Sequence, residues 1–192
     1  MIATFLAAVI TMVAAGAPVS WLDAKTPVSW NTAQRMVLPF RPGAPDAELA
    51  KGGHCAASVR PPTSTEDHAL TERGWSLAGP YQRYGVTSVV SAMAGVDGMC
   101  RPMGYQSFVF VDGWYAGTLS PKAMDARTDG AISSLSISLW EANSFTVDYS
   151  RYTPADPLCC PHSSSVVTFK VKSLAGRPHI VPVDVTTQKN PQ

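Results

Sequence analysis

Apolar and polar residues alternate along the second half of the chain in three segments of strand length. Because successive side chains of a β-strand point to opposite faces of a sheet, this alternation predicts half-buried strands. The connections between them are shorter than the dozen or so residues that a parallel crossover needs, which favours an antiparallel meander. The alternating apolar residues are Leu135, Ile137 and Leu139, then Phe145, Val147 and Tyr149, then Val167, Phe169 and Val171.

The sequence FVFVDGWYAG carries the clearest local signal in the chain. Two apolar runs, Phe108 to Val111 and Trp114 to Gly117, flank the dipeptide Asp112-Gly113. Asp-Gly suits the type I′ turn, in which both central residues have positive φ, and this turn matches the twist of paired strands. We therefore predict a tight β-hairpin here.

A short helix and one further strand complete the predicted domain. A residue among 63–65 can cap a helix whose first turn holds Glu66 and Asp67 and which ends at Gly74. The β-branched and small residues from Val86 to Ala94 predict a strand before the next turn. The predicted fold is mainly β, with α+β as the alternative: an antiparallel meander with one short helix, braced by disulfides.

The chain divides into four predicted parts. Residues 1–24 contain the apolar run FLAAVITMVAAGA and predict a signal peptide or, alternatively, a membrane anchor. Residues 25–50 form a Pro-rich linker or pack on the domain as irregular coil. Residues 51–175 form the β-rich domain. In the C-terminal extended tail, 176–192, prolines confine Ile180 to Val185 to an edge strand or an extended tail.

Composition narrows the classes of function. The formal net charge of the 192 residues is +1, so no strong field favours nucleic acid, and we expect no nucleic-acid partner. Charged residues make up 15% of the chain, below the usual share of about 25%, and turn-forming residues replace them. This balance suits short strands joined by turns better than a helical protein.

Four cysteines point to disulfides. Cys55, Cys100, Cys159 and Cys160 are an even set in a chain predicted to be exported, where an oxidising compartment lets disulfides persist. Three pairings are open. A bond between the adjacent Cys159 and Cys160 closes a cramped ring, so crossing pairs to Cys55 and Cys100 are at least as plausible.

The peptide DPLCCPH offers a second interpretation of the cysteines. Cys159, Cys160 and His162 provide soft and imidazole ligands for zinc or copper, and Cys55 with His54 can complete the set. This spacing matches no common structural zinc pattern. We favour disulfides, expect no metal or other cofactor, and keep a metal carrier as an alternative.

Patterns typical of catalysis do not occur. No serine lies in GxSxG or SxxK, no histidine has a neighbouring pattern that identifies a base, and no Gly-rich loop opens a helix. Asp97, Asp112 and Asp129 each precede a glycine, which turn formation explains. An envelope hydrolase stays an alternative that needs histidine and carboxylate groups converging in a cleft.

Binding without chemistry is the favoured function. Loops at Met99 to Tyr105 and Leu119 to Gly130 can present polar groups from a rigid sheet. Aromatic residues can line a sugar or peptide groove, although they more often pack between strands. The aromatic residues in question are Trp75, Tyr81, Tyr84, Tyr105, Trp114 and Tyr115. The candidate ligand-binding residues are Arg101, Trp114, Tyr115, Arg127 and Asp129.

Three segments resemble the LppP/LprE family of bacterial envelope lipoproteins. They are DGMCRPMGYQSFVFVDGWYAGTLSP, MDARTDGA and YTPADPLCCPHSSSVVTF, and the resemblance covers roughly Trp75 to Val171. It implies export, a place in the cell envelope and a small domain with paired cysteines, but no reaction. Lipoproteins carry lipid on a cysteine just after the apolar run, whereas the first cysteine here is Cys55.

From these patterns we predict an exported protein of the periplasm or cell envelope. The first hypothesis is a non-catalytic binding or structural domain whose partner is an envelope protein or a small ligand. The N-terminal segment can tether it to the membrane. A soluble or tethered form fits this sequence better than a lipid-anchored one.

Overall fold

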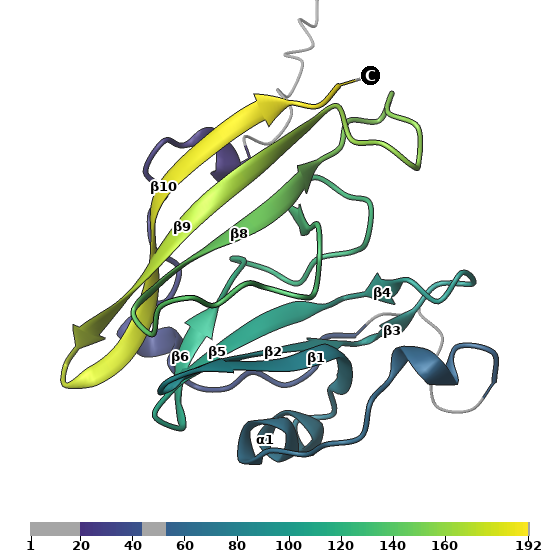
Figure 1. Ribbon diagram of the computed structural model, residues 1–192. Helices are drawn as coiled ribbons and strands as arrows, with labels where there is room; N and C mark the ends of the chain where they lie inside the picture. Colours follow the sequence, from purple (N-terminus) through teal and green to yellow (C-terminus); the bar gives the residue numbers. More distant parts are fainter. Residues whose placement is uncertain (1–19, 44–52, 192) are drawn as a thin grey trace, which may run out of the picture.

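The computed structural model describes residues 20–43 and 53–191, which form two four-stranded antiparallel sheets (Figure 1). The first sheet has the order β1-β2-β5-β6 and the second the order β10-β9-β8-β7. A two-stranded hairpin, β3 and β4, extends from the first sheet. The strands of the first sheet and its hairpin are β1 (Ser76–Tyr84), β2 (Thr87–Met93), β3 (Gly95–Val96), β4 (Pro102–Met103), β5 (Gln106–Val111) and β6 (Trp114–Thr118). Those of the second sheet are β7 (Ala131–Ile132), β8 (Ser144–Arg151), β9 (Ser163–Leu174) and β10 (Arg177–Lys189).

The mainly β, antiparallel fold is therefore confirmed, with two meanders in place of one. The two strands predicted to contain Phe145 and Val167 are β8 and β9, which pair with each other. The strand predicted from Val86 is β2. The segment predicted from Ile180 is β10, which pairs with β9 at the edge of the second sheet, so the edge-strand alternative holds. Ile180 is completely buried, which makes β10 part of the core.

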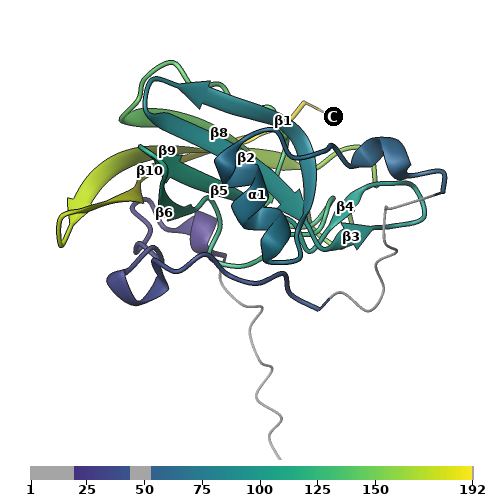
Figure 2. The ribbon, with the colours of Figure 1, turned by 90° about the horizontal axis from the view of Figure 1, so that it is seen from below.

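The first sheet is covered on both of its faces. Figure 1 shows the second sheet over one face of the first sheet, and Figure 2 shows α1 (Thr65–Glu72) across the other face. Val109 of β5 points into the core between the sheets, while its neighbours Phe108 and Phe110 point toward Trp75 in the core beside α1. All of β5 is buried, because it is a central strand covered on both sides.

The hairpin of β5 and β6 forms where the sequence predicts it. Asp112 and Gly113 both have positive φ, 52° and 74°, which is the signature of a type I′ turn. The pairing shifts register between Val109 and Phe110, so β6 bulges beside Gly117. The predicted helix is also confirmed: α1 is capped by Ser64, whose hydroxyl accepts a hydrogen bond from the Asp67 amide.

One predicted strand is wrong. Residues 135–139 alternate in burial, with Ile137 buried, but they form no ladder. They lie beside the edge of β1, whose pairing with β2 shifts register between Ala78 and Gln82. Leu135 packs so closely over Gly79 that a Cβ there would lie 2.8 Å from the Leu135 Cβ. Because β1 bulges at this edge, the segment is held through the Gln82 side chain, which donates to Leu135 O, instead of a backbone ladder.

The described part of the predicted linker packs on the domain as irregular coil with the short 3-10 turn η2 (Ala33–Arg35). Another short 3-10 turn, η1 (Trp21–Asp23), lies just before the predicted linker. A third such turn, η3 (Ala56–Ser58), precedes α1. The segment 20–43, called the N-terminal segment below, buries Leu22 and Trp30 in the core between the sheets. The predicted signal peptide or anchor lies almost wholly outside the described residues. Among the helices of the part that is described, none is long and apolar enough to span a membrane.

Asn31 joins the N-terminal segment to the edges of both sheets. Its side chain accepts a hydrogen bond from Thr118 N at 2.9 Å and donates to Thr118 O at 3.0 Å and to Ile180 O at 3.1 Å. Gly117 leaves room for this contact, since a Cβ at that residue would lie 2.3 Å from the Asn31 Cγ. Asn31 is 4% exposed, so the three hydrogen bonds are buried. They replace the ladder partners that edge strands otherwise lack.

Candidate ligand-binding site

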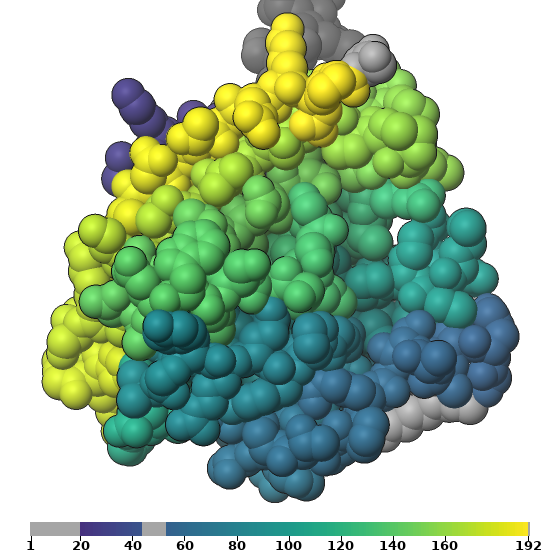
Figure 3. Space-filling view, in the orientation of Figure 1, coloured from purple at the N-terminus to yellow at the C-terminus, as the bar shows by residue number. Residues whose placement is uncertain are grey.

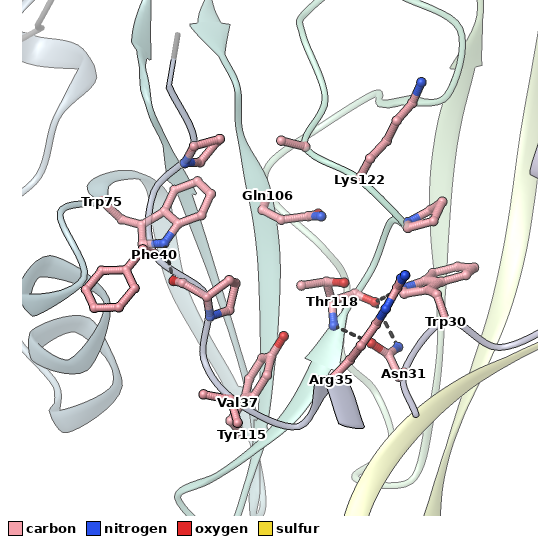
Figure 4. A pocket seen from close by; sticks show the side chains of 14 residues that line it. Trp30, Asn31, Arg35, Val37, Phe40, Trp75, Gln106, Tyr115, Thr118 and Lys122 are labelled. Carbon is pink, nitrogen blue, oxygen red and sulfur yellow. Dashed lines mark hydrogen bonds between the residues drawn. The ribbon is translucent and has the colours of Figure 1, made fainter. Parts of the chain in front are cut away.

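A pocket of about 320 Å³ lies between the N-terminal segment and β5, β6 and the loop after β6 (Figure 4). Half of its fourteen lining residues come from the N-terminal segment. The volume is at the lower end of the range for small-molecule sites, about 300–1,000 Å³. The pocket therefore suits a small ligand.

Gln106, the first residue of β5, lies between the two sides of the pocket (Figure 4). Its side-chain amide donates a hydrogen bond to Ser120 O at 3.0 Å. Its Oε1 atom is buried and has no hydrogen-bond partner among the described residues, and the residue is only 5% exposed. A buried acceptor without a partner costs about 1–3 kcal/mol, so a ligand with an N–H or O–H group would recover a lost interaction.

Aromatic side chains form much of the pocket wall. The Trp75 indole is fixed because its Nε1 donates to Pro39 O at 2.9 Å, and the Trp30 indole because its Nε1 donates to Thr118 O at 2.9 Å. The Tyr115 hydroxyl points into the pocket in Figure 4. Burial raises the pKa of Tyr115 well above its usual value, so the hydroxyl stays protonated at neutral pH.

The pocket carries positive charge only. Arg35 and Lys122 are the charged residues among the fourteen that line it, and the lining contains no carboxylate, histidine, cysteine or serine. The Thr118 hydroxyl there donates to Ser120 O at 2.8 Å. The lining thus offers apolar surface, hydrogen-bonding groups and two cations, without a nucleophile paired to a base.

Comparison with protein families gave a match. Residues 82–173 match the family model described as LppP/LprE lipoprotein. This part of the chain is thus similar to the LppP/LprE lipoprotein family. Searches of curated proteins and of solved structures gave no match.

The LppP/LprE segment runs from the end of β1 to the end of β9, which confirms the resemblance read from the sequence. It places the protein, at a coarse level, among cell-envelope proteins. Within the pocket the segment supplies Gln106, Tyr115 and Lys122. Trp30 and Arg35 lie outside it, so the pocket is built by the LppP/LprE segment together with the N-terminal segment.

The five predicted ligand-binding residues do not share one site. Tyr115 alone of them lines the pocket. Trp114, half exposed in the hairpin, lies under the Arg177 guanidinium, whose Cζ is 4.6 Å from the ring centroid. Asp129 accepts a hydrogen bond from Arg151 Nε at 2.6 Å, and the same guanidinium binds Asp23, which fixes the N-terminal segment to β8.

Arg101 and Arg127 line a second cavity, of about 260 Å³, together with Tyr105 and Tyr152. Figure 3 shows the molecule hollowed between the teal segment near residue 100 and the green segment above it. Arg101 forms an ion pair with Asp97. Arg127 has a positive φ of 64°, a conformation that non-glycine residues seldom adopt.

The cysteines pair as Cys55 with Cys100 and Cys159 with Cys160, so the crossing pairs are not formed. The sulfurs of the alternative metal set are thus engaged in a disulfide, although metal binding needs thiolates. His162 Nδ1 lies 2.9 Å from Asp156 Oδ2. His54, Cys55 and Cys100 do lie together, but their two sulfurs are bonded to each other.

The other aromatic residues divide between core and surface. Tyr105 is buried between the sheets, Trp75 and Tyr81 belong to the core beside α1, and Tyr84 is half exposed. Sequence reasoning missed Gln106 and the N-terminal segment as pocket residues. The signal for Gln106 was its place at the start of the apolar strand QSFVFV, where core packing does not explain a side-chain amide.

Proposed function

We propose that this chain is a non-catalytic ligand-binding protein of the cell envelope, and that the pocket under the N-terminal segment binds a small molecule. The observation that carries the proposal is Gln106, which lies in a pocket wall rich in aromatic groups and whose buried Oε1 has no partner among the described residues. A ligand with an apolar body and one hydrogen-bond donor complements this surface.

The pocket's composition supports binding over hydrolysis. Hydrolysis needs a nucleophile or an activated water, with a base to remove its proton. The described lining has no histidine or carboxylate to act as that base. Of the described histidines, His162 has a carboxylate partner, Asp156, but neither residue lines the pocket.

The proposed location is outside the cytoplasm, either in the periplasm or tethered to the membrane. The match of residues 82–173 to a lipoprotein family supports a place in the envelope. The disulfide between Cys55 and Cys100 supports an oxidising compartment. The apolar leader in the sequence supports export.

Dansylamide is a suitable probe, because it is neutral and combines an aromatic body with a sulfonamide N–H donor. We expect saturable dansylamide fluorescence with one site in the wild-type protein. Val37→Trp would fill the pocket, which Val37 lines, and weaken binding at least tenfold. Val28→Trp is the matched control, because Val28 is also an exposed valine of the N-terminal segment but lies outside the pocket lining.

Two results would refute the proposal. One is the absence of saturable binding to the wild-type protein. The other is equal affinity of the Val37→Trp and Val28→Trp variants, since binding would then occur elsewhere. Circular dichroism of both variants checks that the added indole leaves the fold intact.

A further inference from the structure

The two ends of the pocket differ in chemistry. In Figure 4, Trp75 and Phe40 lie on one side, whereas Arg35 and Lys122 extend from the other. Phe40 is held in place by the Arg73 guanidinium, whose Cζ lies 4.5 Å from the ring centroid. A ligand in this pocket therefore meets an aromatic end and an end where two cations lie on the side of Trp30.

Neither cation of the pocket is neutralised within the described part of the chain. Arg35 and Lys122 take part in none of the salt bridges among these residues, in contrast to Arg60, Arg101 and Arg151, which each face an aspartate. Since the lining includes no acidic residue, nothing in it offsets the two charges. Unpaired cations beside apolar surface favour an anionic group on the ligand.

Gln106 determines which chemical group of the ligand fits between the two ends of the pocket. Figure 4 places its side chain between Trp75 and the side that holds Lys122. The hydrogen bond from its amide nitrogen to Ser120 O fixes the orientation of the amide, and the unpaired Oε1 can only accept a hydrogen bond. A donor in the middle of the ligand would satisfy this atom.

We propose that the pocket's ligand is a small amphipathic anion, with an apolar or aromatic body toward Trp75, an N–H or O–H donor to Gln106 Oε1, and an anionic group toward Arg35 and Lys122. This inference rests on the proposed function and names its ligand class. A volume of about 320 Å³ accommodates a compact molecule of this kind and excludes a lipid with two long acyl chains.

Dansylglycine and dansylamide form a matched pair of probes for this inference. Both have the same aromatic body and a sulfonamide N–H, but only dansylglycine has a carboxylate. We expect dansylglycine to bind about tenfold more tightly at low ionic strength. The preference should shrink in 0.5 M salt, because the cations are at the exposed rim of the pocket.

Variants locate the source of the preference. The double variant Arg35→Ala/Lys122→Ala should bind both probes equally. Its control, Lys25→Ala/Lys170→Ala, removes the same charge from exposed positions outside the pocket and should keep the tenfold preference. Gln106→Met should weaken both probes about tenfold, and Ser120 O keeps its hydrogen bond from the Thr118 hydroxyl.

The outcomes separate this inference from the proposed function. Equal affinity of the two probes in the wild-type protein would overturn the ligand class, while the loss of dansylamide binding in Val37→Trp would still uphold the pocket. A preference that survives in Arg35→Ala/Lys122→Ala would overturn the assignment of the anion to these residues. Dansylamide binding that is unaffected by Val37→Trp would refute the proposed function itself.

Discussion

Asn31→Ala is the substitution that most directly tests how the N-terminal segment is attached. The native side chain makes three buried hydrogen bonds, two to Thr118 and one to Ile180 O. Alanine removes all three and leaves only a small void. The effect should therefore come from the backbone groups that lose their partners.

The expected loss follows from counting those groups. Thr118 N and Ile180 O lose their side-chain partner, and Ile180 O faces away from β9, because the opposite residue Val171 donates its N–H to Asn143 O. Each buried group left unpaired costs about 1–3 kcal/mol. We therefore expect a loss of about 4 kcal/mol in the free energy of unfolding, a large part of the 5–15 kcal/mol that stabilises most domains.

Chemical denaturation with the disulfides intact measures this loss. Asn143→Ala serves as the control, since Asn143 is exposed and its side chain makes no hydrogen bond among the described residues, so its effect should stay below about 0.5 kcal/mol. Gly117→Ala tests the same contact from the other side, because its Cβ would collide with the Asn31 amide. If the free energy of unfolding of Asn31→Ala lies within 1 kcal/mol of the wild-type value, the three hydrogen bonds do not hold the edges of the two sheets together.

Two further predictions concern the disulfides and pH. Replacing Cys55 and Cys100 with alanine should lower the free energy of unfolding, measured by urea denaturation, by about 2–4 kcal/mol, because that bond spans 45 residues. Cys159→Ser/Cys160→Ser should lower it by less than about 1 kcal/mol, because a bond between adjacent residues closes almost no loop. Equal losses would contradict this reasoning. Burial opposes the ionisation of Asp67, but its hydrogen bonds to the partly buried Arg60 guanidinium and to the residues at the start of α1 outweigh burial and lower its pKa to about 2, from 3.8. Between these two pKa values the unfolded chain binds more protons than the folded protein. About 2 kcal/mol of stability, which is fully present above pH 5, should therefore disappear as the pH falls from 4 through 2. Asp67→Asn should flatten this part of the plot of stability against pH.

The parts of the fold that the sequence predicts well are those whose cause is local. The Asp112-Gly113 turn follows from two residues that tolerate positive φ, and β8 and β9 follow from an alternation that continues across both strands. The segment around Ile137 alternates in the same way yet forms no strand, because what decides it is the bulged edge of β1 more than fifty residues earlier in the chain. Alternation reports burial, while a ladder also needs a partner with free backbone groups.

The pocket could not be predicted for a similar reason. Half of its lining residues, Trp30 and Arg35 among them, come from the N-terminal segment, which has no periodic pattern. Their position depends on the hydrogen bonds of Asn31 to strands 87 and 149 residues away. A site assembled across such separations leaves only weak local marks. The clearest was an amide, Gln106, at the start of an otherwise apolar strand.

Stability and binding should be coupled through this arrangement. Asn31 attaches the N-terminal segment to both sheets, and its neighbours Trp30 and Arg35 form part of the pocket wall. A ligand that contacts this wall and Gln106 together binds only the state in which the segment is docked. By mass action it must stabilise that state, by about 2.7 kcal/mol at a concentration one hundred times its Kd. Conversely, Asn31→Ala should weaken dansylamide binding, because part of the binding energy would be spent on docking the segment.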